Sequence, residues 1–154
     1  MINQNLIKTV LNKILNLNKE EKLLIISDNV KKNLAEEFFM YAVSNKYKAK
    51  LTLIPELKQN GEEPSRDVSK EMLHSNAILM ITNKSLSHTE ARRFASEKGA
   101  RIISAPGITE EILNRCVDID YEELMKRHQW LRPIIANSQE IKVTTKLGTE
   151  ITFS

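Results

Sequence analysis

Four short runs rich in aliphatic residues, each followed by a segment with helical periodicity, constrain the fold of this chain more than any other feature. Runs of this kind are typical of strands buried on both faces, as in a parallel sheet covered by helices. The alternation predicts an α/β fold that is Rossmann-like, with a mostly parallel sheet and helices on both faces. The expected strands are Leu23–Ile26, Ala49–Ile54, Asn76–Ile81 and Arg101–Ser104.

The segments between these runs carry apolar residues at helical spacing, with charged residues opposite them. The last expected helix has an apolar stripe that predicts packing on a core, and Pro133 is expected to kink or split it. Residues 55–64 are the most loop-like stretch and are expected to be mobile. The expected helices cover residues 1–17, 30–45, 64–74 and 87–98, and two more begin near Thr109 and Asp120.

The C-terminal sequence has a different pattern. Residues 141–145 and 149–153 alternate apolar and polar side chains around Lys146–Gly148, which predicts a β-hairpin. We therefore expect an α/β domain over residues 1–138 and a C-terminal β-hairpin over 139–154 that begins a missing C-terminal domain. An unpaired apolar strand edge invites pairing with another chain, so a homo-oligomer is also expected.

Charge and composition exclude several classes of protein. The 23 Lys and Arg residues are interspersed with 20 Asp and Glu, so no basic stripe indicates nucleic-acid binding, and few aromatic residues are available to stack on bases. No segment approaches the ~20 apolar residues of a membrane span. The single cysteine, Cys116, excludes an internal disulfide. We expect a cytoplasmic protein without a nucleic-acid or membrane partner.

The candidate binding loop follows the third expected strand. Ligands of open α/β sheets bind beyond the carboxyl ends of the strands, where helix N-termini offer free backbone amides to an anion. A competing interpretation is structural, because Ser87 and Glu90 have the spacing of a capping box that forms without any ligand. The candidate ligand-binding residues are Lys84, Ser85, Ser87, His88 and Thr89.

No catalytic or metal-binding residue is predicted. The three histidines are not spaced as a metal pair, and no glycine-rich phosphate-binding motif occurs. His74 is expected at a helix C-terminus and His128 in packing. Cys116 follows Arg115, but an inert, half-buried thiol is the expected state. We expect no cofactor in this chain.

Several sequence runs resemble the aminopeptidase T family of thermophilic-type, leucyl-aminopeptidase-like metallopeptidases. They are Lys84–Arg93, Gly99–Ile102, Pro106–Glu111, Val117–Tyr121, Val143–Thr145, Gly148–Thr149 and Thr152–Ser154. The resemblance implies an N-terminal α/β domain, followed in the family by a C-terminal domain whose glutamates, histidines and an aspartate hold divalent metal. No residue of this chain aligns with those ligands.

Two functional hypotheses follow. The first is a non-catalytic N-terminal domain, or a relative without the catalytic half, of an aminopeptidase T-like metallopeptidase, contributing to substrate access or subunit contacts. Its partner would be the missing C-terminal domain or another copy of the chain. The alternative is a free-standing module that binds a small anion through the loop at residues 84–89.

Overall fold

The computed structural model describes residues 2–117 and 119–154. The chain forms two compact units, residues 1–118 and residues 119–154. The last long helix thus groups with the hairpin, whereas the sequence placed it with the α/β domain. No residue of that helix is buried, so the helix contributes no side chain to a hydrophobic core.

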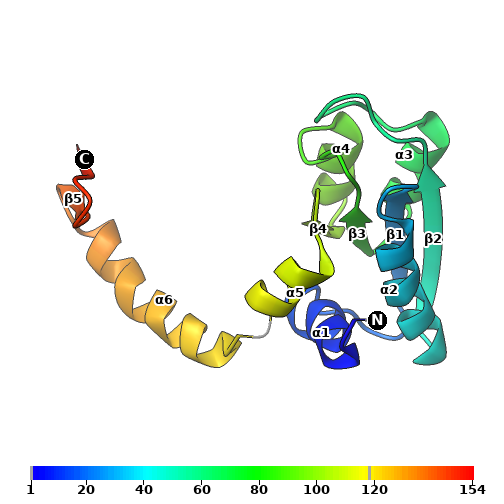
Figure 1. The fold of residues 1–154 in the computed structure, drawn as a ribbon, viewed down its shortest axis with the longest axis horizontal. Coiled ribbons are helices and arrows are strands. Elements are labelled where there is room, and N and C mark those ends of the chain that lie inside the picture. Colours follow the sequence, from blue (N-terminus) through cyan, green and yellow to red (C-terminus); the bar gives the residue numbers. More distant parts are fainter. Residues whose placement is uncertain (1, 118) are drawn as a thin grey trace. The chain divides into compact units, whose positions relative to one another are not determined.

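The first unit is built on a parallel sheet of four strands (Figure 1). The strands are β1 (Lys22–Asp28), β2 (Lys48–Ile54), β3 (Ala77–Ile81) and β4 (Arg101–Ser104), in the order β2-β1-β3-β4. Six of the seven residues of β1 and all five of β3 are buried, whereas the edge strands β2 and β4 have a single buried residue between them, Ile54. The predicted α/β class and the parallel sheet are confirmed.

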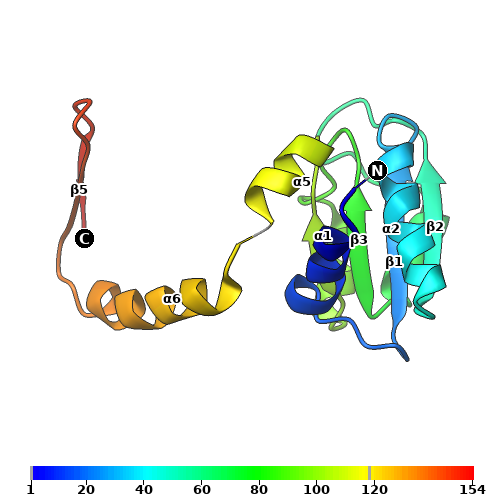
Figure 2. The same ribbon diagram turned by 60° about the horizontal axis from the view of Figure 1, so that its bottom comes forward.

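Helices cover both faces of this sheet. One face packs against α1 (Gln4–Lys8), the π-helical turn η1 (Thr9–Ile14), α2 (Lys32–Ser44) and α5 (Glu110–Cys116). Figure 2 shows α1 and α2 in front of the strands. The core of this face includes Leu11, Ile25, Phe38, Leu79 and Leu113.

The other face packs against α3 (Arg66–Leu73) and α4 (Glu90–Glu97), which contact each other. Its core includes Leu24, Ile26, Met72, Met80 and Ala95. Successive residues of a strand point to opposite faces, so the unbroken run Leu23–Ile26 supplies both cores at once. A strand buried on both faces needs apolar residues at every position, which is why the unbroken aliphatic run predicted it.

The N-terminal helix differs from the expected continuous α-helix. It changes to π-helical geometry at Thr9, and Asn16 ends it in the left-handed region with φ of 48°. Arg101 fixes this end: its Nε donates to the carbonyl oxygen of Leu15 at 2.8 Å, and its Nη2 donates to that of Asn16 at 3.2 Å. The same Nη2 lies 2.6 Å from Oε2 of Glu21. One side chain therefore ties the N-terminal segment to β4.

The second unit consists of α6 (Tyr121–Ala136) and a hairpin of β5 (Ile141–Thr144) and β6 (Glu150–Phe153). The predicted hairpin is confirmed. Pro133 does not split the helix, because it lies in the last turn and removes a single N–H donor there. The expected packing of the α6 stripe on a core is wrong for this chain: no residue of α6 is buried, and His128 is exposed.

Candidate functional site at the carboxyl edge of the sheet

The strand order places a topological switch point between β1 and β3. The chain passes from β1 to β2 on one side of β1 and then returns to β3 on its other side. The loops leaving β1 and β3 therefore run in opposite directions, which is where open α/β sheets bind ligands. Ser27 and Asp28 end β1 here, and Thr82 and Asn83 follow β3.

The carboxylate of Asp28 occupies the switch point. The residue is fully buried. Its Oδ1 accepts hydrogen bonds from the backbone amides of Val30 and Lys31 at 3.1 and 3.0 Å, and its Oδ2 accepts one from the amide of Asn83 at 2.5 Å. Three backbone donors offset the cost of burying this charge. Asp28 thus binds the loops after β1 and β3 to each other.

Neighbouring polar groups at this edge are also used within the chain. The hydroxyl of Ser27 donates to the carbonyl oxygen of Ile81 at 2.7 Å. Nζ of Lys31 donates to the carbonyl oxygens of Gly107 and Ile108 at 3.2 and 2.9 Å, which joins the start of α2 to the loop after β4. Among the described residues, no buried side-chain nitrogen or oxygen lacks a partner. The buried polar groups at this edge therefore bond to one another and to the backbone of the chain.

The predicted binding loop lies where the sequence placed it, but its cap differs. Thr89 is the N-cap of α4, and its Oγ1 accepts from the amide of Arg92 at 3.2 Å. Ser87 does not cap the helix, because its hydroxyl donates instead to Oγ of Ser104 on β4 at 2.8 Å. The capping box expected for Ser87 and Glu90 is therefore wrong.

The other candidate residues have mixed surroundings. The amide of Ser85 donates to Oδ1 of Asn60 at 2.8 Å, and its carbonyl oxygen accepts from the amide of Gly61 at 2.8 Å. Lys84 is half-buried and His88 is exposed. Within residues 2–117 and 119–154, neither of these two side chains has a hydrogen bond or an ion pair. In the described chain, the side chains of Lys84 and His88 are therefore available for a ligand, whereas the neighbouring hydroxyls and amides already form hydrogen bonds within the chain.

A carboxylate from the chain itself already occupies the N-terminus of α4. Oε1 of Glu63 accepts from the amide of Glu90 at 2.5 Å, and its Oε2 accepts from the amide of Ala91 at 3.3 Å. The α4 amides therefore hold an anion, as helix N-termini do, but it is supplied by the 55–64 loop. Sequence reasoning missed this contact, because its only local signal is the pair Glu62–Glu63 in a loop 27 residues away.

Further contacts attach the 55–64 loop, which was expected to be mobile. Leu57 is buried in the core formed with α3 and α4. Nδ2 of Asn83 donates to Oε1 of Glu56 at 2.6 Å. Gly61 has φ of 81°, a conformation that L-residues rarely adopt, and its amide donates to Ser85. The loop covers the carboxyl edge through these contacts and that of Glu63.

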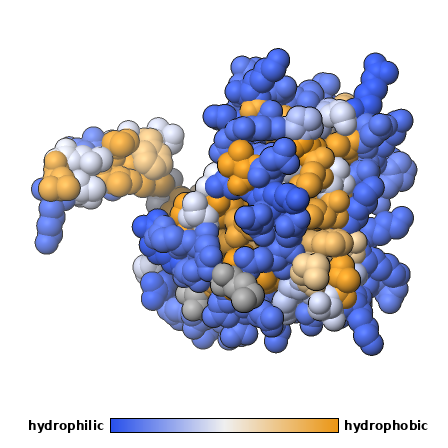
Figure 3. Space-filling view, turned by 45° about the vertical axis from the view of Figure 1, so that its right-hand side comes forward, coloured by the Kyte–Doolittle hydropathy of each residue, from blue (hydrophilic) through white to orange (hydrophobic). Residues whose placement is uncertain are grey.

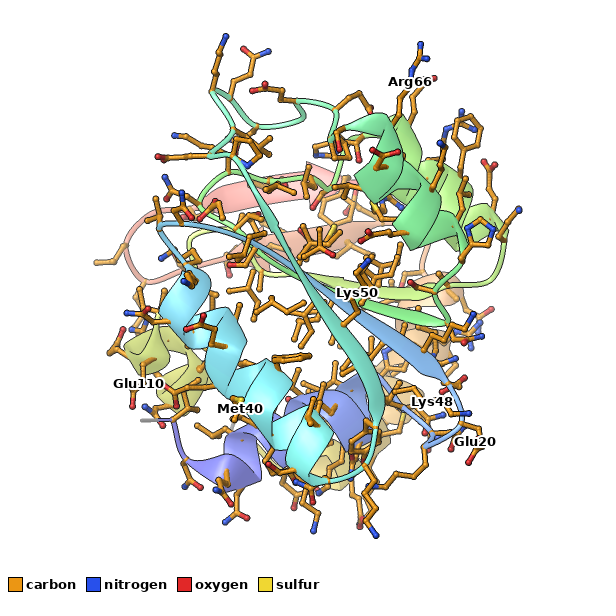
Figure 4. All side chains as sticks on the ribbon, turned by 90° about the vertical axis from the view of Figure 1, so that its right-hand side faces the viewer. Glu20, Met40, Lys48, Lys50, Arg66 and Glu110 are labelled. Carbon is orange, nitrogen blue, oxygen red and sulfur yellow. The ribbon has the colours of Figure 1, made fainter. Side chains whose placement is uncertain are left out.

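A hollow lies at the opposite end of the strands, lined by apolar residues together with several charged ones. A cavity of about 390 Å³ is lined by residues of β1, β2 and α3 that include Lys22, Lys48, Lys50 and Glu71. Burial raises the pKa of Glu71, but its hydrogen bonds from Lys50 and Thr52, at 2.6 Å each, lower it further, with a net decrease. Lys48 lies 2.5 Å from Glu20 and lowers the pKa of that carboxyl (Figure 4). These carboxylates neutralise part of the lysine charge.

The remaining described His, Cys, Asp and Glu side chains form no metal site. Within the described ranges, no three His, Cys, Asp or Glu side chains lie together as a metal site would need. His74 is the C-cap of α3, as predicted, whereas Cys116 is exposed and not half-buried. None of the helices in residues 2–117 and 119–154 combines the length and apolar character that crossing a membrane requires.

Comparisons with known proteins show the fold alone. No protein-family model and no curated protein matches the sequence. Among solved structures, the chain is similar to 2,5-dihydroxypyridine dioxygenase from Pseudomonas putida KT2440, with a TM-score of 0.71 and 12% sequence identity. The similarity covers 97% of this chain and 47% of the dioxygenase, so the chain spans about half the length of that structure.

Proposed function

We propose that the chain is a non-catalytic N-terminal α/β domain of an aminopeptidase T-like metallopeptidase, or a relative that lacks the catalytic half. The observation that carries the proposal is the fold similarity, in which nearly the whole chain corresponds to less than half of a larger enzyme. The resemblance of its sequence runs to the aminopeptidase T family supplies the choice of enzyme class. Hydrolysis by a divalent metal in a separate domain, and a cytoplasmic location, belong to the same proposal.

The carboxyl edge supports a scaffolding role. The runs Lys84–Arg93 and Pro106–Glu111, which resemble the family, form the loops after β3 and β4 and the starts of α4 and α5. Their contacts with Asn60, Glu63 and Lys31 join these loops to the rest of the unit. A catalytic site needs a nucleophile or base with an orienting partner, whereas these groups orient backbone. These contacts fix the conformation of the loops, which suits them to form a rigid surface for a substrate or a second domain.

Complementation in trans tests this proposal. The purified chain is mixed with the separately expressed, metal-loaded C-terminal domain of an aminopeptidase T-type enzyme, and hydrolysis of leucine p-nitroanilide is followed. We expect no turnover by the chain alone with added Zn²⁺ or Co²⁺, and at least a several-fold increase in turnover over that of the catalytic domain alone. Metal-dependent turnover by the chain alone, or no stimulation by a folded chain that binds the catalytic domain, contradicts the proposal.

The small-anion module remains the second candidate, because the α4 amides already hold a carboxylate. A free anion must displace Glu63, so Glu63→Gln should strengthen binding of inorganic phosphate measured by calorimetry. His88→Ala in the same background should weaken that binding if the exposed imidazole takes part. Equal heats for the wild type and for Glu63→Gln, without saturation, would exclude this alternative.

A further inference from the structure

The 55–64 loop carries a chemically reactive dipeptide, Asn60–Gly61, in which the asparagine is exposed. Figure 3 shows hydrophilic side chains at the upper end of the first unit, where Figure 1 places the segment between β2 and α3. An asparagine followed by glycine is the sequence most prone to deamidation, because glycine has no side chain to hinder attack by its backbone nitrogen. The loop therefore presents a reactive dipeptide to solvent.

The same dipeptide attaches the loop to the carboxyl edge of the sheet. Oδ1 of Asn60 accepts a hydrogen bond from the amide of Ser85 at 2.8 Å, and the amide of Gly61 donates to the carbonyl oxygen of Ser85 at 2.8 Å. We call these two hydrogen bonds the Ser85 clamp. Glycine is needed at position 61 because its φ is 81°. The fold thus uses both residues of the dipeptide.

Deamidation would break the Ser85 clamp. The backbone nitrogen of Gly61 attacks Cγ of Asn60 and forms a C–N bond, and the side-chain nitrogen leaves as ammonia with the proton that Gly61 loses. The nitrogen of the resulting succinimide carries no hydrogen, so it cannot donate to Ser85. Water then cleaves one of the two C–N bonds of the ring and gives aspartate or, more often, isoaspartate.

The folded loop restrains this reaction. The attacking nitrogen must give up the proton that it donates to Ser85, so attack requires the loop to open first. Apart from the buried side chain of Leu57, the attachments of the loop are hydrogen bonds of exposed or partly buried groups. Such contacts are released in local openings that cost less free energy than global unfolding. The rate of modification is therefore the intrinsic rate multiplied by the open fraction.

Isoaspartate at position 60 would weaken the attachment of the whole loop. It lengthens the backbone by a methylene group, which shifts the amide of Gly61 away from its place opposite Ser85. It also replaces a neutral amide by a carboxylate in a loop that is already acidic. The loop has three carboxylates and a single basic residue: Glu56, Glu62, Glu63 and Lys58. Added repulsion between like charges opposes the closed arrangement.

We propose that Asn60 is a site of spontaneous deamidation whose rate is set by opening of the 55–64 loop, and that isoaspartate there detaches the loop from the carboxyl edge of the sheet. The modification does not reverse in the purified chain, so the edge stays uncovered once it has occurred. This inference does not rest on the proposed enzymatic role, because it uses only hydrogen bonds within the first unit.

Peptide mass spectrometry of the full chain tests the site and its control by the loop. Asn60 should deamidate about tenfold more slowly in native buffer than in guanidinium chloride, because attack requires the open loop. Glu63→Gln weakens the bonds to the α4 amides and should raise the native rate several-fold. Glu90→Gln is the matched control: it removes the same charge beside α4, but the Glu90 side chain pairs with Arg93. It should leave the native rate unchanged.

Three outcomes of this experiment overturn the proposal. The first is an equal rate in native and denaturing buffer, which would mean that the Ser85 clamp does not restrain the reaction. The second is a native chain without product at Asn60 after the denatured chain has fully reacted, which would mean that the loop does not open. The third is equal acceleration by Glu63→Gln and Glu90→Gln.

Hydrogen exchange tests the consequence for the loop. The isoaspartate form is identified with isoaspartyl methyltransferase and separated by ion exchange. Its amides of Ser85, Glu90 and Ala91 should exchange several-fold faster than in the unmodified chain, with β1 and β3 unchanged. Asn60→Asp adds the charge but keeps the backbone length, so it should give a smaller increase. Unchanged exchange at the three amides in the isoaspartate form contradicts the proposal, whereas failed complementation with a catalytic domain does not bear on it.

Discussion

Residues 2–117 and residues 119–154 follow the same sequence rules and reach opposite outcomes. Both contain helices with an apolar stripe, yet Phe38 of α2 is 1% exposed whereas Leu131 of α6 is 43% exposed. Polar groups differ in the same way: Asp28 is buried and bonded to three amides, whereas the side chains of Glu122 and Arg132 are uncommitted in the described chain. Periodicity thus shows that a helix has an apolar face but not which surface covers it.

The largest difference between the units should appear when a large side chain is truncated. Phe38→Ala leaves a cavity in a close-packed core and should lower the free energy of unfolding of the first unit by about 3–5 kcal/mol. Trp130→Ala removes a comparable side chain from an exposed position and should leave that value unchanged within ~0.5 kcal/mol. Urea unfolding followed by circular dichroism measures both. If both variants lower the free energy of unfolding by similar amounts, the two units unfold as one cooperative unit.

Asp28 and Asp120 provide a second matched pair, since each accepts hydrogen bonds from backbone amides. Asp28→Asn turns a donor toward a buried amide and should cost about 2 kcal/mol in the urea unfolding of the first unit. Asp120 caps α6 at 3.0 Å from the amides of Glu122 and Glu123, and Asn is an equally good cap, so Asp120→Asn should leave helicity almost unchanged. If Asp28→Asn leaves the free energy of unfolding unchanged, the three hydrogen bonds of Asp28 do not stabilise the first unit.

Arg101 and Arg127 allow a long-range ion pair to be compared with a local one. Arg101→Lys cannot reach all three of its acceptors and should lower stability by about 1 kcal/mol, with faster amide exchange over residues 15–21. Arg127→Lys on α6 alters only a local pair with Glu123 and should have no measurable effect on the first unit. Hydrogen exchange by mass spectrometry measures both. Unchanged protection at residues 15–21 would exclude the proposed tether.

The smallest expected effect is a dependence on pH at the amino ends of the strands. Burial raises the pKa of Glu71, but the hydrogen bonds from Lys50 and Thr52 and the charge of Lys50 together lower it by more, so the ionised carboxylate is stabilised in the folded state relative to the unfolded state. This stabilisation is present above the unfolded pKa and is lost as the pH falls through the lower folded pKa. We expect at most about 1 kcal/mol, measured as the difference between wild type and Glu71→Gln in urea unfolding from pH 7 to pH 3. A difference that grows on acidification would contradict the sign.

The sequence predicted local features well because local interactions decide them. Runs such as Leu23–Ile26 indicated strands, and the alternation around Lys146–Gly148 indicated the hairpin. The cap of α4 was predicted incorrectly, because Ser87 and Thr89 are both acceptable caps and the choice depends on Ser104 across the sheet. The site was predicted only as a loop: Glu63 and Asp28 reach their amides from distant segments, which no local pattern encodes.

The sequence by itself determined which segments form strands and helices, because backbone propensity and apolar period are properties of neighbouring residues. It also determined the α/β class, since alternating strands and helices require crossovers. Only the tertiary structure decided that the α4 amides hold Glu63, that Asp28 closes the switch point, and that the stripe of α6 remains uncovered. Those outcomes depend on which surfaces and charges meet in space, and burial and pairing energies arise only when they meet.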